Sequence, residues 1–264
     1  TNTDSGSGLV SQAPAYGESD FYSLKNAGID AIVDPVNMSG KFNSSVKGLE
    51  GKYVKDADEL IIKQLDERGL LFSKTVETHS YPFCWRTGQP LIYKAIPTWF
   101  VNVEKISDRM VELNAETHWV PGFIGEKRFS NWLADARDWA ISRNRYWGSC
   151  IPIWINDDDP DDIICVGSIE QLKELSGVEV DDLHKHFLDE IKIEIDGKTY
   201  TRTPEVLDCW FESGSMPYGQ QHYPFENSEN FMDGFPADFI AEGLDQTRGW
   251  FYTCLLYTSP SPRD

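Results

Sequence analysis

Two stretches near the end of the chain decide how its fold is interpreted: residues 208–218 read DCWFESGSMPY, and residues 236–252 read PADFIAEGLDQTRGWFY. The tryptophans Trp210 and Trp250 bracket a dense group of polar side chains in mostly apolar sequence: Glu242, Asp245, Gln246 and Arg248. A buried polar atom costs roughly 1–3 kcal/mol unless it is hydrogen-bonded. Apolar walls with a few convergent polar groups are typical of ligand pockets, so these stretches predict a small-molecule site.

The composition indicates a folded globular protein. The chain has 264 residues, of which 40% are hydrophobic and nine are tryptophan, enough for one large domain or two ordinary ones. The formal net charge of −19 argues mildly against a nucleic-acid partner, because phosphate binding needs local Lys and Arg. A basic strip on one face remains compatible with that total charge.

The cysteines and the hydropathy pattern indicate where the protein works. Five widely spaced cysteines without a C-x-x-C pair predict a reducing compartment, with neither a disulfide framework nor a zinc site. No apolar run approaches the ~18 residues that a membrane span needs. No signal peptide is visible, and the chain opens without Met. We therefore expect a cytoplasmic protein of which this chain is a piece.

Hydrophobic periodicity predicts helices over residues 56–71, 106–114, 129–141 and 169–176. Asp56 is expected to cap the first helix, with Glu59 at the capping-box position, and Gly69 is expected to end it. Ser168 and Gly177 are expected to bound the last of these helices.

Turn residues and β-branched residues predict strands elsewhere. Residues 76–100 are rich in aromatic and β-branched side chains interrupted by prolines, which predicts short strands. Residues 8–21 predict a strand, a turn and a loop, and residues 191–201 predict a hairpin around Asp196 and Gly197. Short strands come first and α/β-like segments follow, so we expect two domains with a boundary between residues 95 and 125.

Five blocks occur in an order that resembles the isoleucyl-tRNA synthetase family. They are HSYPFCWR at 79–86, KAIPTWFV at 94–101, WAISRNRYWG at 139–148, VLDCWFESG at 206–214 and AEGLDQTRGWFY at 241–252. The resemblance covers residues 1–253, and the stretch SMPYGQQHYPFEN is similar to the eukaryotic cytosolic type. Valyl and leucyl synthetases share the fold, but DQTRGWF after AEG resembles the isoleucyl version.

The resemblance implies an α/β class I synthetase, in which a β-rich editing insertion interrupts a Rossmann-type catalytic domain. It implies that residues 1–100 form the C-terminal part of that insertion. Residues 101–253 would return into the second half of the catalytic domain, with a small insert near 151–205. Residues 254–264 resemble a translated sequencing adapter and are expected to be non-native, the alternative being a natural disordered tail.

The resemblance assigns roles to the polar group at the end of the chain. Glu242 would contact the amino group of the isoleucyl-adenylate, and Asp245 and Gln246, following a strand over residues 238–241, would lie near its ribose. Trp210 and Trp250 would form flat walls of the isoleucine pocket. Without the resemblance, the tryptophans are more often ordinary core and the polar residues a solvated loop.

An apolar pocket discriminates poorly against a smaller side chain, because one methylene contributes only about 1–3 kcal/mol of binding free energy. The isoleucine–valine pair is itself the standard example of this limit. The resemblance therefore implies a second, hydrolytic site that removes valine. Residues 6–20, GSGLVSQAPAYGESD, match the family pattern GTGxVHxAPxxGxxD, in which Asp20 would hold the α-amino group of misattached valine as the editing residue. Taken alone, Asp20 would more often be a turn carboxylate.

The editing block departs from the family at two positions. Ser7 replaces a threonine, which is a small change, and Ser11 replaces a histidine. Serine cannot take up a proton near pH 7 as histidine does. We expect weakened or altered editing, a lineage with another pocket arrangement, or a misread codon.

One strip of basic residues is a candidate for phosphate contact: Lys127, Arg128, Arg137, Arg143 and Arg145. Arg143 and Arg145, close to Tyr146 and Trp147, are candidates for binding the tRNA acceptor end. An ion-pair network with Asp135 or Asp138 is the equally weighted alternative. His184 and His186 lack further ligands, so we expect no metal site.

The resemblance implies that the intact protein is an isoleucine–tRNA ligase, with ATP (as its Mg²⁺ complex), isoleucine and tRNA(Ile) as its partners and no membrane. The motifs HIGH and KMSKS, with which this family acts on the triphosphate, do not occur in the chain, so we expect the chain alone to be inactive. The alternatives are a non-catalytic binding fragment and a valyl-type enzyme. Membership of a multi-synthetase complex leaves no mark in the sequence.

Overall fold

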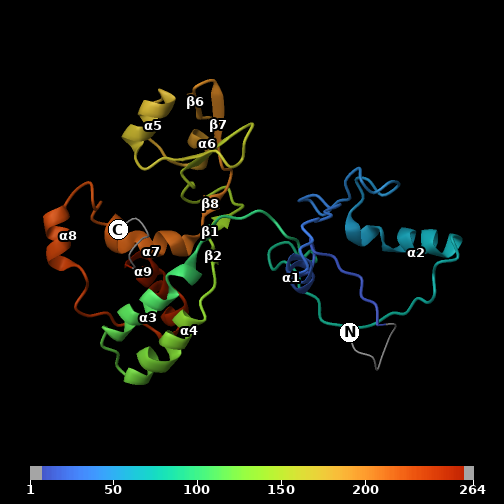
Figure 1. Cartoon of the computed structure of the whole chain (residues 1–264), viewed down its shortest axis with the longest axis horizontal. Coiled ribbons are helices and arrows are strands. Elements are labelled where there is room, and N and C mark those ends of the chain that lie inside the picture. The colour runs from blue at the N-terminus through green and yellow to red at the C-terminus, as the bar shows by residue number, and fades with distance from the viewer. Residues whose placement is uncertain (1–7, 259–264) are drawn as a thin grey trace. The chain divides into compact units, whose positions relative to one another are not determined.

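The computed structural model describes residues 8–258. The chain divides into two compact units, Thr1–Pro97 and Thr98–Asp264, of which residues 8–97 and 98–258 are described. Figure 1 shows the helices and strands of each unit. Ser7 and residues 259–264 of the expected tail lie outside the described residues. None of the helices in the described part is long and apolar enough to cross a membrane.

Unit 1 consists of short helices and irregular chain. Its elements are α1 (Glu18–Asn26), the 3₁₀ turn η1 (Val54–Asp56) and α2 (Asp58–Glu67). Isolated bridges join Val36 to Phe42, Lys41 to Tyr53 and Phe83 to Pro90.

Helix α2 confirms the expected element but corrects its start. The chain leaves the helix before Gly69, whose φ of +65° only glycine adopts without strain. Asp56 does not cap the helix, because it lies in the preceding 3₁₀ turn and Ala57 holds the cap position. Glu59 accepts from Lys74 Nζ at 2.7 Å instead of closing a capping box.

The expected strands of unit 1 are not formed within its described residues. Between residues 76 and 99 the only β-type pairing is the isolated Phe83–Pro90 bridge. A strand needs a hydrogen-bonding neighbour, and each proline in this segment removes a donor. The strand expected before Pro14 is also wrong, because this stretch is irregular and leads into α1 at Glu18.

In unit 2, helices pack around the buried side chains of Val103, Met110, Phe129 and Leu133. The elements are β1 (Phe100–Val101), η2 (Val103–Lys105), α3 (Ser107–Ala115), the π-helical turn η3 (Ile124–Phe129), α4 (Ser130–Ala134) and β2 (Trp139–Ala140). The helix over 106–114 is confirmed. The helix expected over 129–141 is wrong at both ends. Helical chain already begins at Ile124 in η3, and α4 ends at Ala134, after which Trp139 and Ala140 pair with β1 in an antiparallel ribbon.

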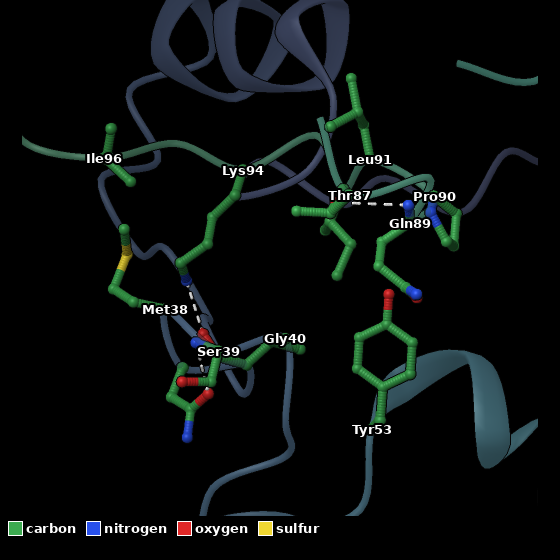
Figure 2. A pocket seen from close by; sticks show the side chains of 13 residues that line it. Met38, Ser39, Gly40, Tyr53, Thr87, Gln89, Pro90, Leu91, Lys94 and Ile96 are labelled. Atoms are coloured by element: carbon green, nitrogen blue, oxygen red, sulfur yellow. Dashed lines mark hydrogen bonds between the residues drawn. The ribbon is translucent and has the colours of Figure 1, made fainter. Parts of the chain in front are cut away.

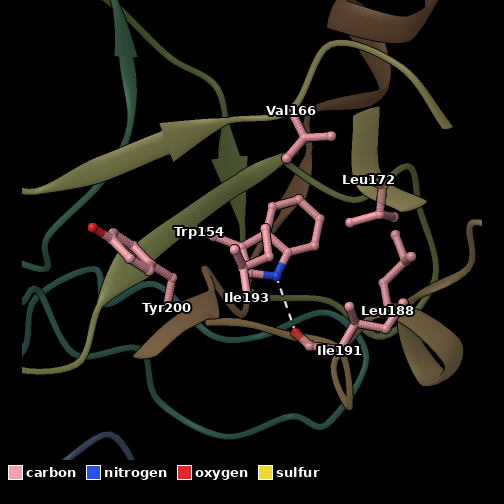
Figure 3. Packing of buried hydrophobic residues seen from close by; sticks show 7 residues of the cluster. All are labelled: Trp154, Val166, Leu172, Leu188, Ile191, Ile193 and Tyr200. Atoms are coloured by element: carbon pink, nitrogen blue, oxygen red, sulfur yellow. Dashed lines mark hydrogen bonds between the residues drawn. The ribbon is translucent and has the colours of Figure 1, made fainter. Parts of the chain in front are cut away.

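A four-stranded antiparallel sheet in the order β5-β4-β7-β6 forms the second core of unit 2. Its elements are β4 (Ile153–Asn156), β5 (Ile163–Cys165), β6 (Lys192–Ile195) and β7 (Lys198–Arg202), with α5 (Ile169–Ser176) and α6 (Lys185–Leu188). Figure 3 shows Trp154 among the aliphatic side chains of this core, where its indole N–H donates to Ile191 O at 3.0 Å.

Local turn signals predict this part of the chain well. Asp196 and Gly197 both adopt positive φ, as the two-residue hairpin turn requires. Ser168 accepts from Gln171 N at the start of α5, and Gly177 ends that helix with φ of +72°. Both expectations are confirmed.

The last elements of unit 2 carry the tryptophan motifs. They are β3 (Ser142–Arg143) paired with β8 (Val206–Leu207), then α7 (Cys209–Gly219), α8 (Ser228–Gly234), η4 (Leu244–Arg248) and α9 (Trp250–Thr258). The strand expected over 238–241 is not formed, because no described strand pairs with it, and Phe239 and Ile240 are exposed. Residues 254–258 continue α9, and their origin stays a prediction.

The contact between α7 and α9 leads to a stability prediction. A Cβ at Gly214 would lie 2.8–2.9 Å from the Cβ and carbonyl group of Thr253. Gly214→Ala is therefore expected to destabilise the protein by about 1–3 kcal/mol through overpacking. Denaturant unfolding measures the change, with Gly234→Ala as the control, because a Cβ at Gly234 meets nothing within 4 Å. Equal stability of the two variants would contradict the prediction.

Candidate functional site

The first turn of α7, which carries Trp210, is fixed by a buried carboxylate. Asp208 is the N-cap of this helix, and its Oδ1 accepts from Trp210 N at 2.7 Å. Its other oxygen pairs with the guanidinium of Arg143 on β3. A capping side chain satisfies a helix donor that otherwise has no partner, so the cap and the ion pair hold this turn together.

Trp250, at the start of α9, is anchored at both its backbone and its ring. Its backbone N–H donates to Gln246 Oε1 at 3.1 Å. Its indole N–H donates to Ser213 O of α7, also at 3.1 Å. The ring is therefore held against α7, and its polar atom is satisfied, as a half-buried indole requires.

Gly249 is the point at which the two tryptophan motifs meet. A Cβ at this position would lie 3.0 Å from Cη2 of Trp210 and 3.1 Å from Oε1 of Gln246. The absence of a side chain lets the Trp210 ring approach the backbone that precedes Trp250. Trp210 remains 42% exposed, so part of its ring is free to contact a ligand.

The remaining polar residues differ in how they are tied to this site. Gln246 Nε2 donates to Asp245 Oδ2 at 3.0 Å, which orients both side chains. Glu242 is exposed, and its carboxylate makes no hydrogen bond or ion pair within residues 8–258. The structure therefore brings Trp210, Asp245, Gln246 and Trp250 together, whereas no contact joins Glu242 to them.

Three supporting groups were missed by the sequence analysis. They are Gly249, the carbonyl of Ser213 and the capping carboxylate of Asp208. Asp208 could have been found, because Asp directly before an apolar helix is a typical N-cap. The glycine before Trp250 gave a weaker signal, and the Ser213 carbonyl gave none.

The basic residues have different environments. Arg143 pairs with Asp208 and donates to the carbonyls of Ala140 and Ser142, each at 2.9 Å. The ion pair thus involves Asp208 rather than Asp135 or Asp138. Arg145 is exposed, and its side chain has no polar partner in the described part of the chain.

Arg145 is followed by two exposed aromatic rings. Tyr146 is 65% and Trp147 71% exposed. The Trp147 ring stacks on His184, with centroids 4.4 Å apart, and Tyr146 lies parallel to His186. Both histidine rings thus stack on aromatic neighbours, and the described residues contain no group of three or more potential metal ligands.

In unit 1, Asp20 lies in the first turn of α1, where a carboxylate interacts favourably with the helix dipole. Its Oδ2 accepts from Ala13 N at 2.9 Å. Ser11 is exposed. A cavity of about 210 Å³ lies beside this turn, lined by Ala15, Gly17 and Lys94 among others.

A larger cavity of about 760 Å³ lies in the same unit (Figure 2). Its lining includes Ser39, Tyr53 and Gln89, and Figure 2 shows Lys94 reaching into it. Lys94 therefore lines both cavities.

Comparison with known proteins gives consistent matches over nearly the whole chain. The family model "tRNA synthetases class I (I, L, M and V)" matches residues 22–260. "Isoleucine--tRNA ligase, cytoplasmic" from Caenorhabditis elegans is 54% identical over 263 residues, covering 97% of this chain and 23% of that protein. The isoleucine–tRNA ligases of Chlamydia abortus and Protochlamydia amoebophila are 54% and 55% identical, over 96% and 98% of this chain. The chain spans about a quarter of the length of these relatives.

Proposed function

The chain belongs to the class I tRNA synthetases of the isoleucine, leucine, methionine and valine group, and we propose that it is part of an isoleucine–tRNA ligase. The intact protein would activate isoleucine with ATP and transfer it to tRNA(Ile). The observation that carries this proposal is the meeting of Trp210, Gln246 and Trp250 around Gly249. The isoleucine-specific names of relatives 54–55% identical favour this substrate over valine.

In the proposed reaction, the carboxylate of isoleucine attacks the α-phosphorus of ATP and pyrophosphate leaves. Trp210 and Trp250 offer apolar faces to the isoleucine side chain. Glu242, whose charge has no partner among residues 8–258, would bind the ammonium group. Asp245 and Gln246, held to each other, would accept and donate at the ribose hydroxyls. These residues contribute by positioning the reactants rather than by making or breaking bonds.

Magnesium bound with ATP would offset charge on the triphosphate. The motifs HIGH and KMSKS, which act on the triphosphate in this family, do not occur in the sequence. We therefore expect no aminoacylation by these 264 residues alone, and a non-catalytic binding role is the alternative for the isolated chain. The name of the C. elegans relative supports a cytoplasmic location.

We assign unit 1 to the editing insertion and unit 2 to the catalytic domain, with Asp20 as the editing residue. Apolar walls such as Trp210 and Trp250 exclude larger side chains. A side chain with one methylene fewer binds only about 1–3 kcal/mol less favourably between them. Valine would therefore be activated, and a second site would have to hydrolyse valyl-tRNA. The position of Asp20 in the turn that carries Gly17 and Glu18 of the smaller cavity supports this role, because its carboxylate can pair with a free α-ammonium group.

We assign tRNA contact to Arg145 rather than to Arg143. The guanidinium of Arg143 is already committed to Asp208 and two carbonyls. Within residues 8–258 the charge of Arg145 has no partner, and it lies next to the exposed rings of Tyr146 and Trp147 in the sequence. Single-stranded RNA is bound by aromatic rings on which bases stack and by cations that contact phosphates.

The amino-acid site is tested by Glu242→Gln in the full-length protein. Losing a charge-assisted hydrogen bond of about 1.5–3 kcal/mol should lower kcat/KM for isoleucine roughly 10–100-fold in ATP–pyrophosphate exchange. Glu229→Gln, an exposed glutamate of α8, is the control and should behave as wild type. An unchanged kcat/KM for Glu242→Gln would show that this residue does not bind the ammonium group.

The editing site is tested by Asp20→Asn, which keeps an oxygen for Ala13 N–H but loses the charge. Deacylation of valyl-tRNA(Ile) should slow at least ~10-fold, because the ammonium group loses its counter-charge. Asp30→Asn, which removes an exposed carboxylate of the same unit outside the cavity lining, should leave the rate unchanged. Ser11→His should raise the rate of valyl-tRNA(Ile) deacylation. If the rate of the Ser11→His variant does not exceed that of the wild type, the serine does not impair editing.

The two arginines should respond differently to removal. Arg145→Ala is expected to raise the KM for tRNA and to reduce the salt slope of binding by about 1, without loss of stability. Arg143→Ala should lower the free energy of unfolding by about 1–3 kcal/mol, because buried Asp208 loses its partner. Aminoacylation at several salt concentrations and thermal unfolding measure both effects. An Arg145 variant with unchanged tRNA kinetics would exclude the contact.

A further inference from the structure

We propose that Tyr16, Asp34 and Lys94 are positioning residues that hold the Asp20 turn in place for hydrolysis of valyl-tRNA. This inference rests on the editing role proposed above for Asp20. It adds three residues, from distant parts of unit 1, that touch no reacting group themselves.

The three side chains form one connected network. Tyr16 Oη donates to Asp34 Oδ1 at 2.7 Å and accepts from Val36 N at 3.2 Å. Lys94 Nζ pairs with Asp34 Oδ2 and donates to Val36 O at 2.6 Å. The same ammonium group lies 5.8 Å from the centroid of the Tyr16 ring. The polar atoms of the network are thus directed at one another.

Backbone hydrogen bonds connect this network to Asp20. Tyr16 belongs to a turn in which its N–H donates to Ala13 O at 2.8 Å, and Ala13 N–H donates to Asp20 Oδ2. Next to Lys94, Ala95 N–H donates to Ala15 O at 2.7 Å. Ala15, in the middle of the turn, is 1% exposed. The turn that orients the Asp20 carboxylate is therefore held through Tyr16 and through the Lys94–Ala95 segment.

The space around the carboxylate leaves little freedom for another arrangement. A Cβ at Gly17 would lie 3.0 Å from Asp20 Oδ2, so the turn closes tightly on the carboxylate. Lys94 lines the small cavity together with Gly17 and Glu18 of this turn. Loss of the lysine would leave that wall open and release Asp34 and Tyr16 from their common partner.

The network is electrostatically fixed over the working pH range. The hydrogen bond from Lys94, and to a smaller extent that from Tyr16, holds the pKa of Asp34 below its ordinary value. Burial, reinforced by the Asp34 carboxylate, raises the pKa of Tyr16 to about 12. Near neutral pH Asp34 therefore stays a carboxylate and Tyr16 a neutral phenol, which suits a constant support rather than a switch.

The Lys94 pair differs from an ordinary surface ion pair of the same unit. The Lys94 side chain is 14% exposed, whereas the Lys74–Glu59 pair is 44% and 81% exposed. Exposed pairs of that kind contribute little to structure. Lys74→Met is therefore a matched control, in which a lysine of the same unit loses a carboxylate partner away from the Asp20 turn.

The experiment compares deacylation of valyl-tRNA(Ile) by full-length variants. Lys94→Met and Tyr16→Phe should lower kcat ~10-fold with KM within ~2-fold of wild type, because misplacing a catalytic group affects the reacting state more than binding. Lys94→Arg, which keeps the charge and the donors, should recover most of the rate. Lys74→Met should match wild type, and isoleucine-dependent ATP–pyrophosphate exchange should be unchanged in every variant.

The outcomes separate this inference from the editing role itself. Wild-type deacylation by Tyr16→Phe and Lys94→Met, with Asp20→Asn impaired, would overturn the positioning role and leave the editing site standing. Normal deacylation by Asp20→Asn would overturn the editing assignment. A raised KM with unchanged kcat, or an Lys94→Arg variant as slow as Lys94→Met, would also contradict positioning. If Lys94→Met fails to fold, the Tyr16→Phe variant tests the positioning role, because this substitution removes only a single oxygen atom.

Discussion

Helices α7 and α9 approach each other so closely that there is no room for a side chain at Gly214, which faces the backbone of Thr253. The same approach places the ring of Trp210 over Gly249 and directs the indole N–H of Trp250 to Ser213 O. Both tryptophans therefore owe their placement to backbone contacts rather than to side-chain packing alone. Walls fixed in this way need little reordering when a ligand binds, which favours affinity and a defined orientation.

Polar contacts at the edge of this packing give the site its chemical character. The Asp208 cap and its pair with Arg143 fix the start of α7, and the Asp245–Gln246 contact orients two polar side chains of η4. The Glu242 carboxylate has neither an ion pair nor a hydrogen bond among the described residues. An apolar pocket with one free carboxylate suits an amino acid, whose ammonium group needs a counter-charge. The same apolar walls explain why unit 1 would need a separate hydrolytic site.

The sequence predicts elements well where the signals are local. The hairpin at Asp196–Gly197 and the helix bounded by Ser168 and Gly177 form as expected, because turn and cap residues act within a few positions. Strands over 76–100 and 238–241 fail because a strand is stabilised by neighbours distant in sequence, which the described residues do not provide. The helix over 129–141 is shortened by a long-range pairing with β1.

The same distinction holds for the functional residues. The resemblance identified Trp210, Gln246 and Trp250, which the structure brings together, but the Tyr16–Asp34–Lys94 network joins segments with no common motif. ATP–pyrophosphate exchange with the full-length protein tests whether the two tryptophans line an isoleucine pocket. We expect kcat/KM to favour isoleucine over valine roughly 10–200-fold, the range known for one methylene in an apolar pocket, for which this amino-acid pair is the standard example. Equal use of the two amino acids, or a preference for valine, would contradict it.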